Sequence, residues 1–185
     1  MTANVAETFG QIDALVTTAS IWNTKPLEDI TATDVRNSFD VNTLGTFLVA
    51  RDVGLQMTRQ PTGGSIVTLG DSSTNRPYID YAAYFIAKGS LPTLTQTLAV
   101  ELGHRNPKVR VNCILPGPIM FPPGISDADA QSLRETTLTK NANCPDMAAH
   151  AVKFLLENKF VTGTCLPIDG GRHIYTPDST TRLPN

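Results

Sequence analysis

Short apolar runs alternate with long helical patterns along this chain. The runs, of five to seven residues, predict four buried strands near 12–17, 64–70, 109–115 and 164–168. Apolar positions at helical spacing predict the intervening helices, near 34–60, 81–103, 127–140 and 145–158. Continuous apolar strands separated by helices are typical of a parallel sheet covered on both faces. The pattern therefore predicts an α/β fold with about four parallel strands.

Proline and polarity refine this outline. Pro92 lies inside the 81–103 pattern and removes a backbone donor, which predicts a kink about one turn after Lys88. The segment 176–185 is polar and contains two prolines, so it is predicted to be a loose tail. Residues 1–175 are expected to form one domain.

The composition of the chain limits the classes of partner that it is expected to bind. The chain has 185 residues, 41% of them hydrophobic, with a net charge of −2 and no basic cluster. This balance argues against nucleic acid or an anionic membrane as a partner. No run approaches a membrane span and no targeting segment is evident, so a cytoplasmic protein is expected. Cys113, Cys144 and Cys165 show no metal-ligand spacing and predict reduced thiols rather than a metal site.

Tyr84 and Lys88 are the most informative residues. A spacing of four places the phenol and the ammonium on one face of a helix. A nearby ammonium favours the phenolate, so we expect the pKa of Tyr84 to lie below its ordinary value of about 10. Such a pair can exchange a proton with a substrate.

Further motifs surround this pair in a fixed order. They are Thr17–Ser20 after the first apolar run, Asp40–Gly45, Gly70–Ser73 after the second, Pro116–Pro118 after the third and Asp169–Gly171 after the fourth. Together with the Tyr/Lys helix, they resemble the short-chain dehydrogenase/reductase family over about Val5 to Tyr175. The resemblance implies a Rossmann-like doubly wound sheet, a nicotinamide dinucleotide cofactor, a small-molecule substrate and a homo-oligomer, either a dimer or a tetramer.

The resemblance also assigns roles. Tyr84 would donate a proton, Lys88 would bind the nicotinamide ribose and lower the pKa of the tyrosine, and Asn42 would help to hold the lysine and a water. Met120 would begin the substrate loop. The other residues implied to contact the cofactor are Ala19, Ser20, Pro116, Gly117 and Ile119.

Asp71 departs from the common family pattern, which has a serine thirteen residues before the tyrosine. A buried, protonated carboxyl there could itself donate a proton, which suits reduction of a C=N bond. The alternative is a loop shifted by one residue, which would use Ser72.

Pteridine reductases and dihydromonapterin reductases carry aspartate at this position. They also end the earlier strand in Asn-Ala-Ser, as Ala19-Ser20 does here, and place an aromatic residue two positions later, where this chain has Trp22. The closer resemblance implies an NADPH-dependent pterin reductase in which Trp22, Asp71 and Met120 contact the substrate. The first strand's Thr17-Thr18 departs from this subgroup, and NAD remains an alternative cofactor.

Three other interpretations stay open. The chain could be a general carbonyl or alcohol dehydrogenase of the same family. It could be an enoyl-acyl-carrier reductase that uses Tyr81, because a spacing of seven from Lys88 also places two residues on one helix face. It could also be an inactive remnant without enzymatic function.

The family resembled here begins with a strand and a glycine-rich turn that holds the cofactor's pyrophosphate. No such segment precedes Ile12. We therefore expect the chain to correspond to the C-terminal two-thirds of such an enzyme, truncated at its N-terminus, and to bind NADPH weakly or not at all.

Overall fold

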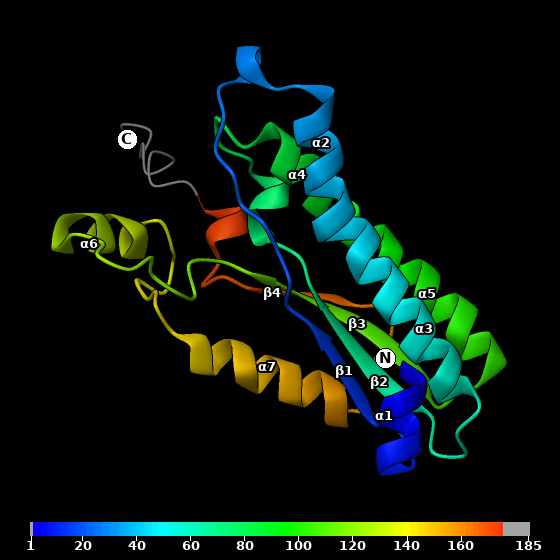
Figure 1. Ribbon diagram of the computed structural model, residues 1–185. Coiled ribbons are helices and arrows are strands. Elements are labelled where there is room, and N and C mark those ends of the chain that lie inside the picture. The colour runs from blue at the N-terminus through cyan, green and yellow to red at the C-terminus, as the bar shows by residue number, and fades with distance from the viewer. Residues whose placement is uncertain (1, 176–185) are drawn as a thin grey trace, which may run out of the picture.

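The computed structural model describes residues 2–175, which form a parallel sheet with helices on both faces (Figure 1). The sheet has four strands that pair in sequence order, β1 (Ala14–Thr17), β2 (Gly64–Leu69), β3 (Val109–Pro116) and β4 (Cys165–Ile168). The predicted α/β class and all four strands are confirmed. The predicted loose tail lies outside the described residues.

The helices follow the predicted order, with one addition. They are α1 (Thr2–Phe9), α2 (Ala32–Phe39), α3 (Thr46–Thr58), α4 (Ala82–Lys88), α5 (Leu91–Arg105), α6 (Asp127–Glu135) and α7 (Pro145–Glu157). The sequence did not predict α1, which has no buried side chain. Short 3₁₀ turns lie at Leu27–Asp29, Ser72–Asn75 and Arg172–Ile174. None of the helices within residues 2–175 combines the length and apolar character needed to cross a bilayer.

The predicted helix near 34–60 is continuous but not uniform. It starts at the cap residue Thr31, whose side chain accepts a bond from the Asp34 N–H while the Asp34 carboxylate bonds back to the Thr31 N–H. Between α2 and α3 the backbone widens into a π-helical stretch, η2 (Asp40–Gly45). Such stretches are rare and often occur at functional sites. This one contains Asn42.

The predicted kink in the second helix is confirmed as a break. Helix α4 ends at Lys88, and α5 begins at Leu91 with Pro92 in its first turn. Proline is tolerated there because the first N–H groups of a helix have no intrahelical partner. The break separates the catalytic candidates on α4 from the packing helix α5.

Two apolar cores lie on opposite faces of the sheet (Figure 1). On one face, α3 and α5 pack on β2 and β3 around Met57, Ile66 and Leu102. On the other, α7 packs through Leu155 against Val67 and the neighbouring strand. Successive strand residues point to opposite faces, so a strand covered on both sides must be apolar throughout. This arrangement explains the continuous apolar runs in the sequence.

Candidate active site

The carboxyl ends of all four strands meet at one edge of the sheet, because every pairing is parallel. Ala19, Asp71, Gly117 and Asp169 follow the four strands at this edge. A side chain at Gly117 would approach Asp169 within 2.6 Å of its Cβ atom, so glycine is required for the close packing of these two strand ends. In doubly wound sheets, ligands bind at this edge.

Tyr84 and Asp71 form the centre of the candidate site. The hydroxyl of Tyr84 donates a hydrogen bond of 2.7 Å to Oδ2 of Asp71. Oδ1 of Asp71 accepts a bond of 2.7 Å from the N–H of Ser73, which fixes the carboxylate at the start of a 3₁₀ turn. The structure thus brings together two residues that lie thirteen positions apart in the sequence.

The expected lowering of the pKa of Tyr84 is wrong for this state of the protein. Burial raises the pKa of Tyr84 well above 10, and the neighbouring Asp71 charge and hydrogen bond raise it further. Sequence spacing indicated the ammonium on the same helix, but it could not show that the carboxylate of Asp71, which follows β2, accepts a hydrogen bond from the tyrosine hydroxyl. Tyr84 is therefore held in its protonated form.

Lys88 lies one turn from Tyr84 and is 4% exposed. Its ammonium donates a bond of 2.8 Å to the carbonyl of Leu69, the last residue of β2. Burial lowers the pKa of Lys88, while Asp71 and Cys113 act in the opposite direction. The bond to Leu69 uses one of the three ammonium hydrogens, which leaves donors for a ligand.

Asn42 is fully buried and contacts the loop after β1. Its Oδ1 accepts bonds from the Ser20 hydroxyl at 2.7 Å and the Ile21 N–H at 3.0 Å. Its Nδ2 donates to the Ile21 carbonyl at 3.0 Å and to the Ser38 hydroxyl at 3.2 Å. The side chain therefore positions this loop. No hydrogen bond joins it to Lys88 within residues 2–175.

The two alternative site residues lie differently. Ser72 is buried, and its hydroxyl has no hydrogen-bond partner among the described residues, whereas Asp71 contacts Tyr84 directly. Tyr81 stacks on Trp22, with ring centroids 5.1 Å apart and planes 18° from parallel. Trp22 is nevertheless 55% exposed, so part of its ring remains accessible.

The remaining predicted contacts with cofactor or substrate lie at the same edge. Ala19 and Ser20 are exposed, Pro116 ends β3, and Met120 is exposed beyond it. The N–H of Gly117 donates to the Ile168 carbonyl at 2.9 Å, and the N–H of Ile119 donates to Gly117 at 2.7 Å. These bonds hold the turn after β3 in a fixed shape.

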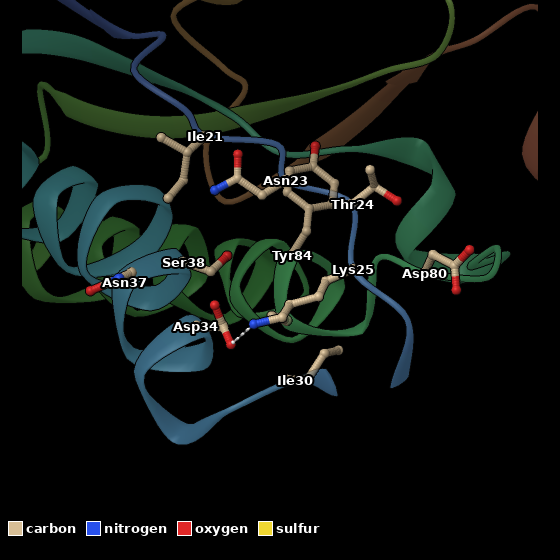
Figure 2. Close-up of a pocket in the computed structure, with 11 residues that line it drawn as sticks. Ile21, Asn23, Thr24, Lys25, Ile30, Asp34, Asn37, Ser38, Asp80 and Tyr84 are labelled. Atoms are coloured by element: carbon tan, nitrogen blue, oxygen red, sulfur yellow. Dashed lines mark hydrogen bonds and ion pairs between the residues drawn. The ribbon is translucent and has the colours of Figure 1, made fainter. Parts of the chain in front are cut away.

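A cavity of about 80 Å³ lies beside Tyr84 (Figure 2). Its walls come from the loop after β1, from α2 and from α4, and an ion pair of 2.8 Å between Lys25 and Asp34 crosses it. Pockets for drug-sized ligands measure about 300–1,000 Å³. This cavity therefore has room for water but not for a substrate.

Sequence reasoning missed two residues that support the site. The hydroxyl of Thr43 donates a 2.9 Å bond to the Ala87 carbonyl, which ties η2 to the end of α4. Tyr78 packs edge-on against Tyr81 and Phe85, with centroids 5.0 and 4.9 Å apart. The spacing of aromatic residues at 78, 81 and 84 was the available signal for Tyr78.

Comparisons with known proteins agree with this geometry. Residues 1–173 match the family model described as enoyl-(acyl carrier protein) reductase. The chain is 32% identical over 169 residues to the D-erythrulose reductase of Gallus gallus, covering 88% of this chain and 68% of that protein. It is 30% identical to the L-rhamnose 1-dehydrogenase (NAD(P)(+)) of Sphingomonas sp. (strain SKA58), covering 93% and 69%.

A solved structure shares both sequence and fold. A putative short-chain alcohol dehydrogenase from Sinorhizobium meliloti 1021 is 30% identical, with a TM-score of 0.80 over 92% of this chain and 69% of the other. The chain belongs to the short-chain dehydrogenase/reductase family, whose members named here are oxidoreductases. It spans about two-thirds of the length of the relatives it matches.

Proposed function

We propose that this protein is a nicotinamide-dependent reductase in which Tyr84 supplies the proton and the Asp71 carboxylate orients the tyrosine hydroxyl. The hydrogen bond of 2.7 Å between the two side chains is the observation that carries this proposal. It holds the proton-donating hydroxyl at the ligand-binding edge of the sheet. The raised pKa of Tyr84 keeps its proton in place until a substrate accepts it.

The residues at this edge fit a nicotinamide cofactor. Lys88 is a buried ammonium with hydrogens left over after its bond to Leu69, and ribose hydroxyls would accept them. Ala19, Ser20 and the turn Pro116–Ile119 would line the same cofactor. When bound, the cofactor supplies a hydride, and the chain supplies the proton. We propose NADPH as the cofactor, with NAD as the alternative.

A pterin is the proposed substrate. Asp71 offers a carboxyl group that can hydrogen-bond a ring nitrogen and its neighbouring amino group, as a serine hydroxyl cannot. Trp22 offers accessible aromatic surface for a flat ring system. Aromatic contacts run from Tyr84 through Phe85, Tyr78 and Tyr81 to Trp22, so both features belong to one cluster.

A small ketose or related carbonyl is the second candidate. The similarity to a D-erythrulose reductase favours it, because such a substrate needs a proton donor but no stacking surface. The enoyl reductase alternative has less support from the geometry. Tyr81 stacks on Trp22, and within the described residues no hydrogen bond joins its hydroxyl to Asp71 or Lys88.

Three substrates separate these candidates: a dihydropterin, erythrulose and a crotonyl thioester, each assayed for oxidation of NADPH. In a form that spans the full length of the relatives, we expect turnover with the dihydropterin and its loss in Asp71→Ser. Asp52→Ser, which changes an exposed carboxylate on α3, is the matched control and should leave the rate unchanged. Unchanged pterin reduction by Asp71→Ser, or turnover of erythrulose alone, would contradict the pterin proposal.

A further inference from the structure

Two of the three cysteines lie side by side on neighbouring strands of the sheet. Cys113 of β3 and Cys165 of β4 are direct partners in the parallel register. Direct partners on neighbouring strands point to the same face, and neighbouring strands lie about 4.7–4.9 Å apart. Disulfides span Cα separations of about 4.4–6.8 Å, so this pair lies within range. Cys144, the third cysteine, lies before α7 and is not part of the sheet.

We propose that Cys113 and Cys165 form a reversible redox site that a peroxide converts into a disulfide. The proposal is independent of the reductase function, because it needs neither cofactor nor substrate. Packing alone does not require two neighbouring cysteines. Each behaves as a small apolar side chain, and one of them could fill its own position without the other.

The two cysteines differ in their exposure to solvent. Cys113 is fully buried, whereas Cys165 lies at the edge strand and is partly exposed. Interaction with the Cys165 thiol lowers the pKa of Cys113 to about 7, and the neighbouring hydroxyls of Thr68 and Thr95 contribute to the lowering. The pair therefore loses its first proton near neutral pH. The hydrogen bond to Cys113, together with burial, raises the pKa of Cys165, so the thiolate lies mainly on Cys113. Exchange of the shared proton between the two sulfurs gives a minor population with the thiolate on Cys165, and a peroxide reacts with this more accessible sulfur.

The reaction balances with one peroxide. The Cys165 thiolate attacks a peroxide oxygen, the O–O bond breaks, and hydroxide leaves as Cys165 becomes a sulfenic acid. The sulfur of Cys113 then attacks the Cys165 sulfur, an S–S bond forms, and the S–O bond breaks. The protons from the two thiols convert the released hydroxides into two waters, while hydrogen peroxide is reduced by two electrons.

The disulfide would be reducible. Parallel neighbours must approach slightly to bring their Cβ atoms to the usual disulfide separation, and strained disulfides are more easily reduced. A small dithiol would reduce the disulfide back to two thiols by thiol–disulfide exchange and would itself become oxidised. The site also lies close to the catalytic candidates, because Cys113 contributes to the electrostatic environment of Lys88.

Mass spectrometry tests the proposal on the 185-residue protein. We expect brief treatment with hydrogen peroxide in native buffer to reduce the alkylatable thiols from three to one, with an intact mass lower by two hydrogens. Proteolysis should link the peptides that contain residues 113 and 165, and dithiothreitol should restore all three thiols. Cys144→Ser is the matched control and should still form the link.

The Cys165→Ser variant should lose the link, and because Cys165 is partly exposed this substitution should not prevent folding. Denatured protein treated in the same way gives the reference for random pairing. Oxidation of Cys165 to a sulfinic acid while Cys113 stays alkylatable would overturn the proposal. A link through Cys144, or between two chains, would overturn it as well.

Discussion

At the scale of single residues, the site depends on partners that sequence spacing does not show. The spacing of Tyr84 and Lys88 correctly placed both on α4, and the structure finds both buried. The pKa of Tyr84, however, is set by burial and by Asp71, which comes from the end of β2. Contacts between distant segments decide such shifts, so a motif within one helix gave the wrong direction.

The tyrosine pKa can be measured directly. We expect Tyr84 to keep its proton above a pH of about 10, the ordinary tyrosine value, because burial and Asp71 both oppose the phenolate. Asp71→Asn removes the charge and should lower the pKa of Tyr84, although burial keeps it raised. Ultraviolet titration measures tyrosinate, and subtraction of a Tyr84→Phe curve isolates this residue from the other three tyrosines.

Asp80→Asn is the control for that titration. Asp80 is exposed and has a positive φ of 67°, a conformation that asparagine tolerates, so the substitution changes charge without strain. It should leave the Tyr84 curve in place. Ionisation of Tyr84 below a pH of about 10 in the unmodified protein would contradict the assignment.

At the scale of elements, η2 is the feature that connects the helices to the site. The sequence predicted one long helix near 34–60 but not its π-helical stretch, because the pattern of apolar residues barely changes across it. Within that stretch, the buried side chain of Asn42 makes four hydrogen bonds, three of them to Ser20 and Ile21 in the loop after β1. The predicted role of Asn42 in holding Lys88 stays a prediction.

Asn42→Ala tests this positioning role. The substitution removes the four bonds and leaves the half-buried N–H and carbonyl of Ile21 without these partners. We expect the free energy of unfolding to fall by about 2–4 kcal/mol, measured by chemical denaturation. Asn37→Ala on the exposed side of α2 is the control and should change it by less than about 0.5 kcal/mol. Equal effects of the two variants would show that Asn42 does not hold the loop.

At the scale of the whole molecule, the sequence predicted the layers of the fold, and the residues of the candidate site follow the strands at one edge of the sheet. Continuous apolar strands and helical connections sufficed, because they determine which faces must be covered. The predicted homo-oligomer and the pterin substrate stay predictions. The sequence analysis did not predict α1, an eight-residue helix with no buried side chain.

Strand β1 lies at one edge of the described sheet, with β2 as its only partner there. Its backbone groups on the other side can pair with another chain, and it has no proline or lysine to discourage this. We expect the 185-residue protein to associate through β1 and sediment as species larger than a monomer. Val16 is 38% exposed, so Val16→Lys should shift the distribution toward monomer.

Ile79→Lys is the control for that shift, because Ile79 is 84% exposed in a loop away from β1. It adds the same charge and should leave the sedimentation profile unchanged. A protein that is monomeric at every concentration, or an equal response to both lysines, would argue against association at this edge.

Turnover by Tyr84→Phe tests the proposed chemistry most directly. The substitution removes the hydroxyl that donates to Asp71 and leaves the ring in its packing with Phe85. Loss of a general acid typically costs about 10²–10⁴-fold in rate, and we expect a loss of this size in NADPH-dependent reduction of a dihydropterin, with the fold unchanged by circular dichroism. Tyr81→Phe should retain activity within about tenfold, because Tyr81 is not expected to supply the proton. Near-normal turnover by Tyr84→Phe, together with loss of turnover in Tyr81→Phe, would contradict the assignment of Tyr84 as the proton donor.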